Sequence, residues 1–216
     1  MIVPKSLEKT VKKVLDGEYD VPELNPERPV ILDIGANVGA FSVWAARRWP
    51  GAAIYSYEPN PETFELLSKN VSNICVNAAV WSRDGESFLY DGNANSAECS
   101  LFHDWRGKDS GHKVKTVAAS SLHPCDILKV DTEGSESIIL NGYLHLHTCK
   151  AVFLEWHSLY DRYHLGSKLL DLGFLCASDA AWAIDCGVMK MVRTKNFVQK
   201  LYYTSPPPEL VCLKIS

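Results

Sequence analysis

Short, nearly continuous apolar runs alternate with polar segments along the chain, and this pattern predicts an α/β fold. Runs of this kind are typical of parallel strands that helices cover on both faces, joined by right-handed crossovers. We expect strands at Val30–Ile34, Ala53–Tyr57, Ile74–Val80, Ile127–Asp131, Ala151–Glu155, Phe174–Ala177 and Leu210–Ile215.

Residues that are typical of helix termini predict where helices begin and end. Asn60 followed by Pro61 is typical of a helix N-terminus. Gly142 and Gly173 are expected to end two later helices in the left-handed conformation. Shorter runs at 87–90 and 114–117 suggest a small extra strand pair, and the prolines at 206–208 precede the expected closing strand.

The segment ILDIGANVGAF, residues 31–41, indicates a ligand-binding turn between a strand and a helix. Gly35 and Gly39 allow a tight turn and close approach of a ligand, and Asn37 tolerates a positive φ. Asp33 and Asn37 depart from the dinucleotide fingerprint Gly-x-Gly-x-x-Gly. A carboxylate there would repel a pyrophosphate, and it suits a cationic ligand tail such as the amino-acid end of S-adenosylmethionine.

Glu58, at the end of the second expected strand, supplies the acidic residue that such a pocket needs for ribose. It follows Gly39 by about twenty residues, the interval at which an acidic side chain holds ribose hydroxyls. Taken alone, Glu58 is a solvated strand-end charge; after the turn at residues 31–41 we interpret it as a ribose ligand.

These segments, with NAAVWSRDGE at 77–86, ILKVDTEGSE at 127–136 and FLEWH at 153–157, resemble the FkbM family of S-adenosylmethionine-dependent methyltransferases. A Cys-Ser-Leu element at 99–101 adds to the resemblance, which covers roughly residues 10–160. It implies a class I methyltransferase (Rossmann-like) fold with a seven-stranded, mostly parallel sheet, an antiparallel last strand and helices on both faces. It also implies methyl transfer, usually to a hydroxyl of a sugar or natural product. The cofactor-binding residues expected on this basis are Asp33, Gly35, Asn37, Gly39, Glu58, Pro59, Asn77, Ala78, Ala79 and Asp131.

Length and composition agree with one enzyme domain. The chain has 216 residues, of which 46% are hydrophobic, enough for a single α/β core and inconsistent with disorder. We expect one domain over 1–216, with an N-terminal helical extension at 1–26 and an insertion at 86–118 that forms a lid.

Charge and cysteine usage predict a cytoplasmic protein without a membrane segment. The N-terminus lacks the apolar stretch of a signal peptide, and no apolar run approaches spanning length. Seven cysteines without a Cys-x-x-Cys pair suggest reduced thiols. The net charge of −4 gives no general attraction to nucleic acid, although cations gather at 106–115 and 190–200. These two segments are either solvated surface or a lid that recognises an anionic group of the acceptor.

The chemistry is expected where the fourth and fifth strands end. Asp131, Glu133, Glu155 and His157 are gathered there, because ligands of open α/β sheets bind beyond the carboxyl ends of the strands. Asp131, Glu133 and His157 are the predicted catalytic residues. The ordinary pKa of histidine favours His157 as the base that takes the acceptor's proton. Asp131 and Glu133 could orient it, accept the proton instead, or hold a divalent ion with Glu155; no metal ligand is assigned.

Lys129 interrupts an apolar strand and points to the same side as Asp131. A lysine there is either paired with a carboxylate for structural reasons, which we favour, or assists deprotonation of the acceptor.

Several functions stay open at this stage. The leading one is O-methylation of a small molecule or carbohydrate with S-adenosylmethionine. The alternatives are methylation of a nucleic-acid ribose or cap hydroxyl, a nicotinamide-dependent oxidoreductase and a non-catalytic cofactor-binding module. The oligomeric state is not predicted.

Overall fold

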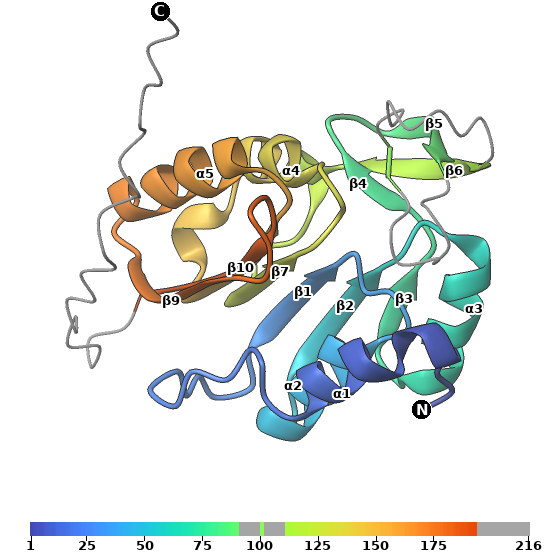
Figure 1. The fold of residues 1–216 in the computed structure, drawn as a ribbon, viewed down its shortest axis with the longest axis horizontal. Coiled ribbons are helices and arrows are strands. Elements are labelled where there is room, and N and C mark those ends of the chain that lie inside the picture. The colour runs from blue at the N-terminus through green and yellow to red at the C-terminus, as the bar shows by residue number, and fades with distance from the viewer. Residues whose placement is uncertain (91–99, 102–110, 194–216) are drawn as a thin grey trace, which may run out of the picture.

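A seven-stranded sheet lies between two layers of helices (Figure 1). The computed structural model describes residues 1–90, 100–101 and 111–193. The helices are α1 Glu8–Leu15, α2 Ala40–Arg48, α3 Pro61–Asn70, α4 Glu136–Gly142 and α5 Leu159–Asp171, with short 3-10 helices at Lys5–Leu7, Ala119–Ser121 and Leu146–Thr148. The strands are β1 Val30–Ile34, β2 Ala53–Tyr57, β3 Ile74–Val76, β4 Ala79–Trp81, β5 Gly85–Tyr90, β6 Gly111–Ala118, β7 Ile127–Val130, β8 Ala151–Trp156, β9 Leu175–Ala181 and β10 Gly187–Val192.

The large sheet has the strand order β3-β2-β1-β7-β8-β10-β9. The order reverses at β1, which pairs in parallel with β2 on one side and with β7 on the other. β10 runs antiparallel to both of its neighbours, β8 and β9. The expected mostly parallel sheet with an antiparallel last strand is therefore confirmed.

The position of the last strand corrects the sequence analysis. The antiparallel strand is Gly187–Val192, whereas we expected Leu210–Ile215, which lies outside the described residues. Lys190, the first residue of the cationic segment 190–200, accordingly belongs to a strand. Its ammonium donates to the carbonyls of Glu18 and Asp20, 2.9 and 3.1 Å away.

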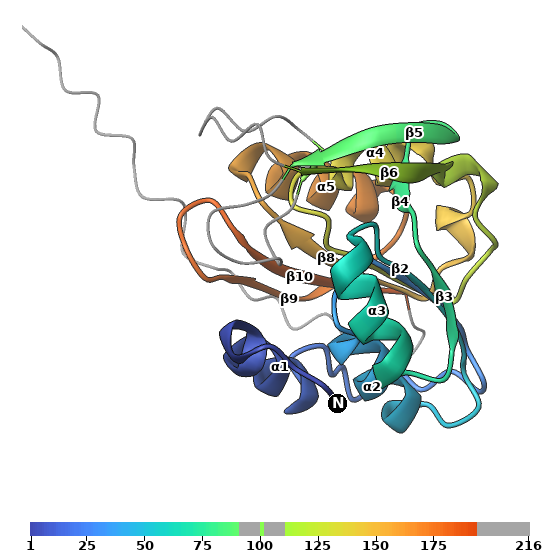
Figure 2. The same ribbon diagram turned by 90° about the vertical axis from the view of Figure 1, so that its right-hand side faces the viewer.

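The expected strand Ile74–Val80 is in fact two strands in two sheets. β3 ends at Val76 in the large sheet, and β4 begins at Ala79 in a small sheet of order β4-β6-β5. The chain turns between them because the backbone N–H of Ala78 is bonded to the Val76 carbonyl, 3.0 Å away. β5 and β6 are the predicted extra pair, and Figure 2 shows the small sheet beyond the end of α3.

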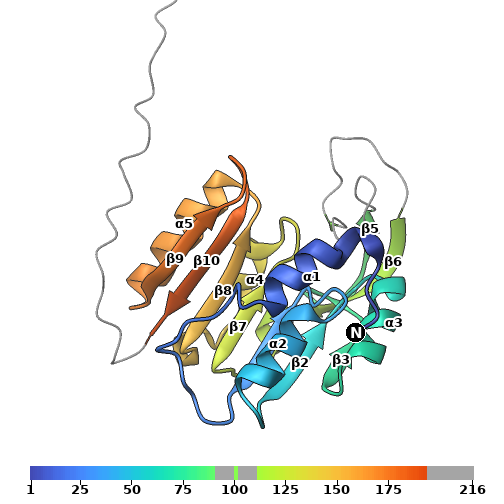
Figure 3. The ribbon, with the colours of Figure 1, turned by 60° about the horizontal axis from the view of Figure 1, so that its bottom comes forward.

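Helices cover both faces of the large sheet, as expected. α1, α2 and α3 lie on one face and α4 and α5 on the other (Figure 3). Aromatic side chains fill the first interface, where Tyr19 and Phe41 contact each other and both contact Trp44 and Phe153. Aliphatic side chains of α4 and α5 form the second.

The N-terminal segment is packed into this fold. Leu7, Val11, Val14, Tyr19 and Leu24 are each buried. The predicted helix is present as α1, and the loop after it carries Tyr19 to the sheet. Residues 1–26 thus contribute to the core of one helical layer.

The two glycines expected to cap helices behave differently. Gly173 has a φ of 83°, which is the left-handed conformation expected after α5. Gly142 ends α4 without a positive φ, so that part of the prediction is wrong. A Cβ at Gly142 would lie 3.1 Å from the Ala119 Cβ, so the glycine here allows close packing of α4 against the 3-10 helix Ala119–Ser121.

Candidate functional site

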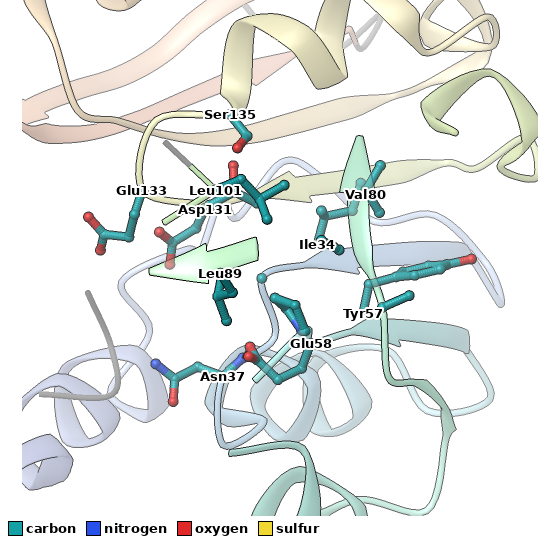
Figure 4. A pocket seen from close by; sticks show the side chains of 15 residues that line it. Ile34, Asn37, Tyr57, Glu58, Val80, Leu89, Leu101, Asp131, Glu133 and Ser135 are labelled. Carbon is teal, nitrogen blue, oxygen red and sulfur yellow. The ribbon is translucent and has the colours of Figure 1, made fainter. Parts of the chain in front are cut away.

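A cavity opens beyond the carboxyl ends of β1, β2 and β7, next to the point where the strand order reverses (Figure 4). Its empty volume is about 580 Å³, part of it open to solvent, and its place at the strand ends is where ligands of open α/β sheets bind. The lining residues are Ile34, Gly35, Asn37, Tyr57, Glu58, Pro59, Ala78, Ala79, Val80, Leu89, Leu101, Asp131, Thr132, Glu133 and Ser135.

The turn after β1 forms one edge of this cavity. Gly35, Asn37 and Gly39 have φ values of 75°, 51° and 89°, all in the left-handed region. A Cβ at Gly35 would lie 1.7 Å from the Asp131 carbonyl oxygen, and one at Gly39 would collide with Leu67 at 2.9 Å. The first glycine therefore lets two loops meet at the cavity, while the second lets α2 and α3 approach and does not line the cavity.

Glu58 fixes this turn and faces the cavity. Its two carboxylate oxygens accept the backbone N–H groups of Asn37 and Asn60, at 2.9 and 2.8 Å. Burial raises the pKa of Glu58 to about 7, against the lowering effect of these two hydrogen bonds. Each oxygen keeps a lone pair for a further donor.

Asn77 holds the loop that carries the other expected cofactor residues. Its side-chain amide donates to the carbonyls of Glu58 and Pro59, at 2.8 and 3.1 Å. This ties the end of β2 to the loop between β3 and β4. Ala78 and Ala79, at the end of that loop, line the cavity with small apolar side chains.

Asp33 lies beneath the cavity and does not line it. Its side chain is fully buried, with one oxygen accepting from Ser42 Oγ at 2.6 Å and the other 3.6 Å from Lys129 Nζ. Burial raises the pKa of Asp33, while the Lys129 ammonium and Ser42 lower it. A ligand above the turn is thus separated from Asp33, and the expected direct contact stays a prediction.

Lys129 bridges the two halves of the site. The buried ammonium donates to the Gly35 carbonyl at 2.7 Å and to Asp131 Oδ2 at 3.3 Å. Burial opposes its charge, but Asp131, Asp33 and Glu155 raise the pKa of Lys129 above its ordinary value. Of the two roles considered for Lys129, pairing with a carboxylate is therefore the one that the structure contains.

Glu136, which the sequence analysis did not single out, organises the loop after β7. Its buried carboxylate accepts from the backbone N–H groups of Thr132 and Gly134 and from Thr132 Oγ1. Between them, Glu133 adopts a φ of 53°, which is uncommon for a residue with a side chain. The signal in the sequence was the acidic residue that follows Gly-Ser at a helix start.

His157 lies among carboxylates from three directions. Nδ1 is 3.1 Å from Glu136 Oε1, and Nε2 is 3.3 Å from Glu133 Oε2 and 3.9 Å from Asp131 Oδ1. Burial disfavours the charged ring, but Glu136, Glu133 and Asp131 outweigh it and raise the pKa of His157 to about 10. This raised pKa differs from the ordinary value on which His157 was favoured as the base, and the role of His157 stays a prediction.

Glu155 completes the group from β8. It accepts a hydrogen bond from the Tyr19 hydroxyl, which the loop after α1 brings to this point. Burial and the neighbouring Asp131 carboxylate raise the pKa of Glu155 to about 8. The structure thus brings Asp131, Glu133, Glu155 and His157 together, as expected from the ends of β7 and β8.

The expected lid at 86–118 is described only in part. Residues 91–99 and 102–110, with the cations from 106 to 110, lie outside the described residues, as do 194–200 of the second cationic segment. Ser100 Oγ donates to the Glu133 carbonyl at 2.8 Å, and Leu101 lines the cavity. The lid stays a prediction.

One family profile matches this chain, and the two relatives described here are both named methyltransferases. The profile described as the methyltransferase FkbM domain matches residues 33–175. Methyltransferase sdnD of Sordaria araneosa is 28% identical over 221 residues, covering 79% of this chain and 83% of that protein. Hexuronic acid methyltransferase AglP of Haloferax volcanii is 27% identical over 163 residues, covering 67% of this chain and 64% of that protein.

Solved structures agree on the fold. The crystal structure of methyltransferase FkbM from Methylobacillus flagellatus KT superposes with a TM-score of 0.57 at 12% identity. The match covers 78% of this chain and 44% of that longer one, so this chain spans less than half of it. Precorrin-6y C5,15-methyltransferase from Geobacter metallireducens GS-15 has a TM-score of 0.50 at 13% identity, covering 89% and 90% of the two chains.

Among the residues that the structure describes, no helix has the length and apolar composition of a membrane span.

Proposed function

This chain belongs to the methyltransferase FkbM family, and from that premise we propose that it transfers a methyl group from S-adenosylmethionine to a hydroxyl of a sugar or a similar small molecule. The observation that carries the proposal is the cavity itself, which has a ribose-type carboxylate at one end and an acidic group at the other (Figure 4). The name of the hexuronic acid methyltransferase AglP supports a sugar-like acceptor.

The residues fit the cofactor that the family implies. Glu58 presents a carboxylate to the cavity, fixed by two backbone N–H groups and suited to a pair of ribose hydroxyls. Ala78, Ala79 and Leu89 give an apolar wall for the adenine ring. Asn37 and Gly35 line the route from Glu58 to Asp131, along which the amino-acid end would lie.

Methyl transfer needs an oxygen nucleophile behind the methyl group. S-adenosylmethionine, when bound, would supply an electrophilic methyl group on its sulfonium, with S-adenosylhomocysteine as the leaving group. The hydroxyl proton must leave at the same time. Holding the two reactants in line supplies a large part of the rate, and a positioned base adds about 10²–10⁴-fold.

We assign the proton acceptor to Glu133. Its side chain lines the cavity and is 31% exposed, so it is open to an acceptor. The left-handed backbone of Glu133 is stabilised by Glu136, whose carboxylate accepts the backbone N–H groups on either side of it. Backbone strain of this kind is often found at functional sites. His157, as a cation, orients Glu133, and Asp131 connects the pair to Lys129.

The experiment that tests this function measures ligand binding and transfer separately. S-adenosylhomocysteine should bind and raise the melting temperature, while NAD should not. Labelled S-adenosylmethionine should transfer its methyl to a sugar acceptor found by mass screening. Glu133→Gln should lower kcat by about 10²-fold or more and leave cofactor affinity unchanged. Binding of NAD in place of S-adenosylhomocysteine would overturn the assignment; transfer only to RNA would shift it to the nucleic-acid alternative.

A further inference from the structure

We propose that Asp131, Glu155 and His157 form a binding site for one divalent cation, of which Mn²⁺ is the best match. One carboxylate oxygen of Asp131, one of Glu155 and one ring nitrogen of His157 all lie within 4.8 Å of one another. Donors around one octahedral ion, at metal–ligand distances of about 2.1 Å, are about 3–4 Å apart. Small side-chain rotations would therefore bring the three donors into coordination.

A separate partner fixes the second polar atom of each proposed ligand. Lys129 Nζ holds Asp131 Oδ2, which leaves Oδ1 facing His157 Nε2 at 3.9 Å. Glu136 holds His157 Nδ1 at 3.1 Å, and Nε2 faces Glu133 and Asp131. The ion would displace the proton on Nε2 and take its place beside these carboxylates. The Tyr19 hydroxyl holds one oxygen of Glu155 and leaves the other. Metal ligands are typically oriented in this way by outer partners, carboxylate–histidine pairs above all.

The charges around these donors also favour a cation. Five carboxylates, those of Asp33, Asp131, Glu133, Glu136 and Glu155, are gathered around the ammonium of Lys129 and the ring of His157. A carboxylate that is shielded from water, as Glu155 is beside Tyr19, is costly unless it is paired or coordinates a metal. The donor set of one imidazole and two carboxylates suits Mn²⁺, because carboxylates favour hard ions and imidazole favours transition metals.

The ion would refine the proposed function by selecting the acceptor. An ion with three protein ligands keeps open positions, and two oxygens of one sugar, such as a vicinal diol or a hydroxy acid, could fill them. Coordination lowers the pKa of a bound hydroxyl, which makes proton transfer to Glu133 easier. This consequence rests on the proposed function, whereas the binding of the ion does not.

Binding is tested with Mn²⁺ on the full chain after treatment with a chelator. We expect one Mn²⁺ per chain by electron paramagnetic resonance and calorimetry, and a nitrogen modulation in the spin-echo signal that disappears in His157→Gln. Asp131→Asn and Glu155→Gln should each weaken binding by tenfold or more. Glu65→Gln, which removes an exposed carboxylate paired with Lys69, is the matched control and should leave binding unchanged.

Tyr19→Phe keeps the packing of the ring and removes only its hydroxyl, so it tests the site even if a ligand variant does not fold. It should weaken Mn²⁺ binding by about 10–100-fold. No saturable binding at millimolar Mn²⁺, a bound ion without nitrogen modulation, or undiminished binding in Tyr19→Phe and Glu155→Gln would each overturn the proposal. S-adenosylhomocysteine binding in the same samples separates the outcomes, because it tests the cofactor pocket whether or not the ion binds.

Discussion

At the scale of single residues, the chemistry of the site depends on how each carboxylate is surrounded. Glu58 and Glu136 are both buried glutamates that accept backbone N–H groups. The pKa of Glu58 is nevertheless raised by burial, whereas the hydrogen bond and charge of His157 outweigh burial and lower the pKa of Glu136. The difference is the hydrogen-bonded cation: His157 contacts Glu136 directly, whereas the charge of Lys129 acts on Glu58 without a hydrogen bond and does not outweigh burial.

Glu58→Gln should weaken binding of S-adenosylhomocysteine by about 1.5–3 kcal/mol, because it removes hydrogen bonds to a charged acceptor. In the unsubstituted chain, affinity should fall as the pH is lowered through about 7, where Glu58 gains its proton. Calorimetry between pH 5.5 and 8.5 checks both effects. In the variant this pH dependence should be absent; an equal slope in both proteins would place the ribose elsewhere.

Glu136→Gln should lower the pKa of His157 from about 10 toward its ordinary value near 6.5, because the closest compensating charge is lost. The ring signal of His157 in NMR titrations of the metal-free protein reports this shift directly. Ser137→Ala, a change to the neighbouring residue, serves as the control. A His157 signal that already titrates near neutral pH in the unsubstituted chain would contradict the electrostatics described above.

At the scale of elements, the apolar runs predicted β1 and β2 with their observed bounds. β1 is buried in all but its first residue, as a strand covered on both faces should be, whereas β2 is exposed at Ala53. The break between β3 and β4 was not predicted, since it depends on hydrogen bonds of Ala78 and Asn77 and not on hydrophobicity. The last strand was misplaced because β10 carries Lys190 and two methionines and lacks a clear alternation.

The β9–β10 hairpin gives a prediction at this scale. Gly187→Ala should destabilise the protein by about 1–3 kcal/mol, the usual cost of overpacking. The new Cβ would lie 2.4 Å from the Ala180 carbonyl oxygen and 2.5 Å from the Trp156 ring. In Gly166→Ala the nearest atom is the flexible end of Met189 at 3.1 Å, so a smaller effect is expected. Urea unfolding of both variants measures the two losses of stability. Equal losses would mean that β10 does not pack against β8 as described.

The sequence predicted which residues gather at the candidate site, but only part of how their side chains contact one another. The ends of β7 and β8 were expected to gather Asp131, Glu133, Glu155 and His157, because topology alone brings strand ends together. The pKa of His157 was not predicted, because it depends on Glu136, five residues beyond the motif's first carboxylate. Tyr19 was also missed, since nothing local indicates a contact with a residue 136 positions away.

At the scale of the whole molecule, the N-terminal segment should be required for stability. Val11→Ala together with Val14→Ala should lower the free energy of unfolding by about 1–4 kcal/mol, because both side chains are buried on α1. Lys9→Ala with Lys12→Ala changes the exposed face of the same helix and should have little effect. Chemical unfolding of the two double variants is the measurement, and equal stabilities would show that α1 is dispensable to the core.

The seam between β1 and β7 has a kinetic consequence. These neighbours are separated by almost a hundred residues of chain, while β1, β2 and β3 follow one another closely. Pairings between distant segments require costly loop closure, so they form slowly. Glu58 belongs to the half that is continuous in sequence, and Asp131, Glu133 and His157 belong to the other. Ligand affinity should therefore appear only in the slowest step of refolding, when the two halves meet and the cavity between them first exists.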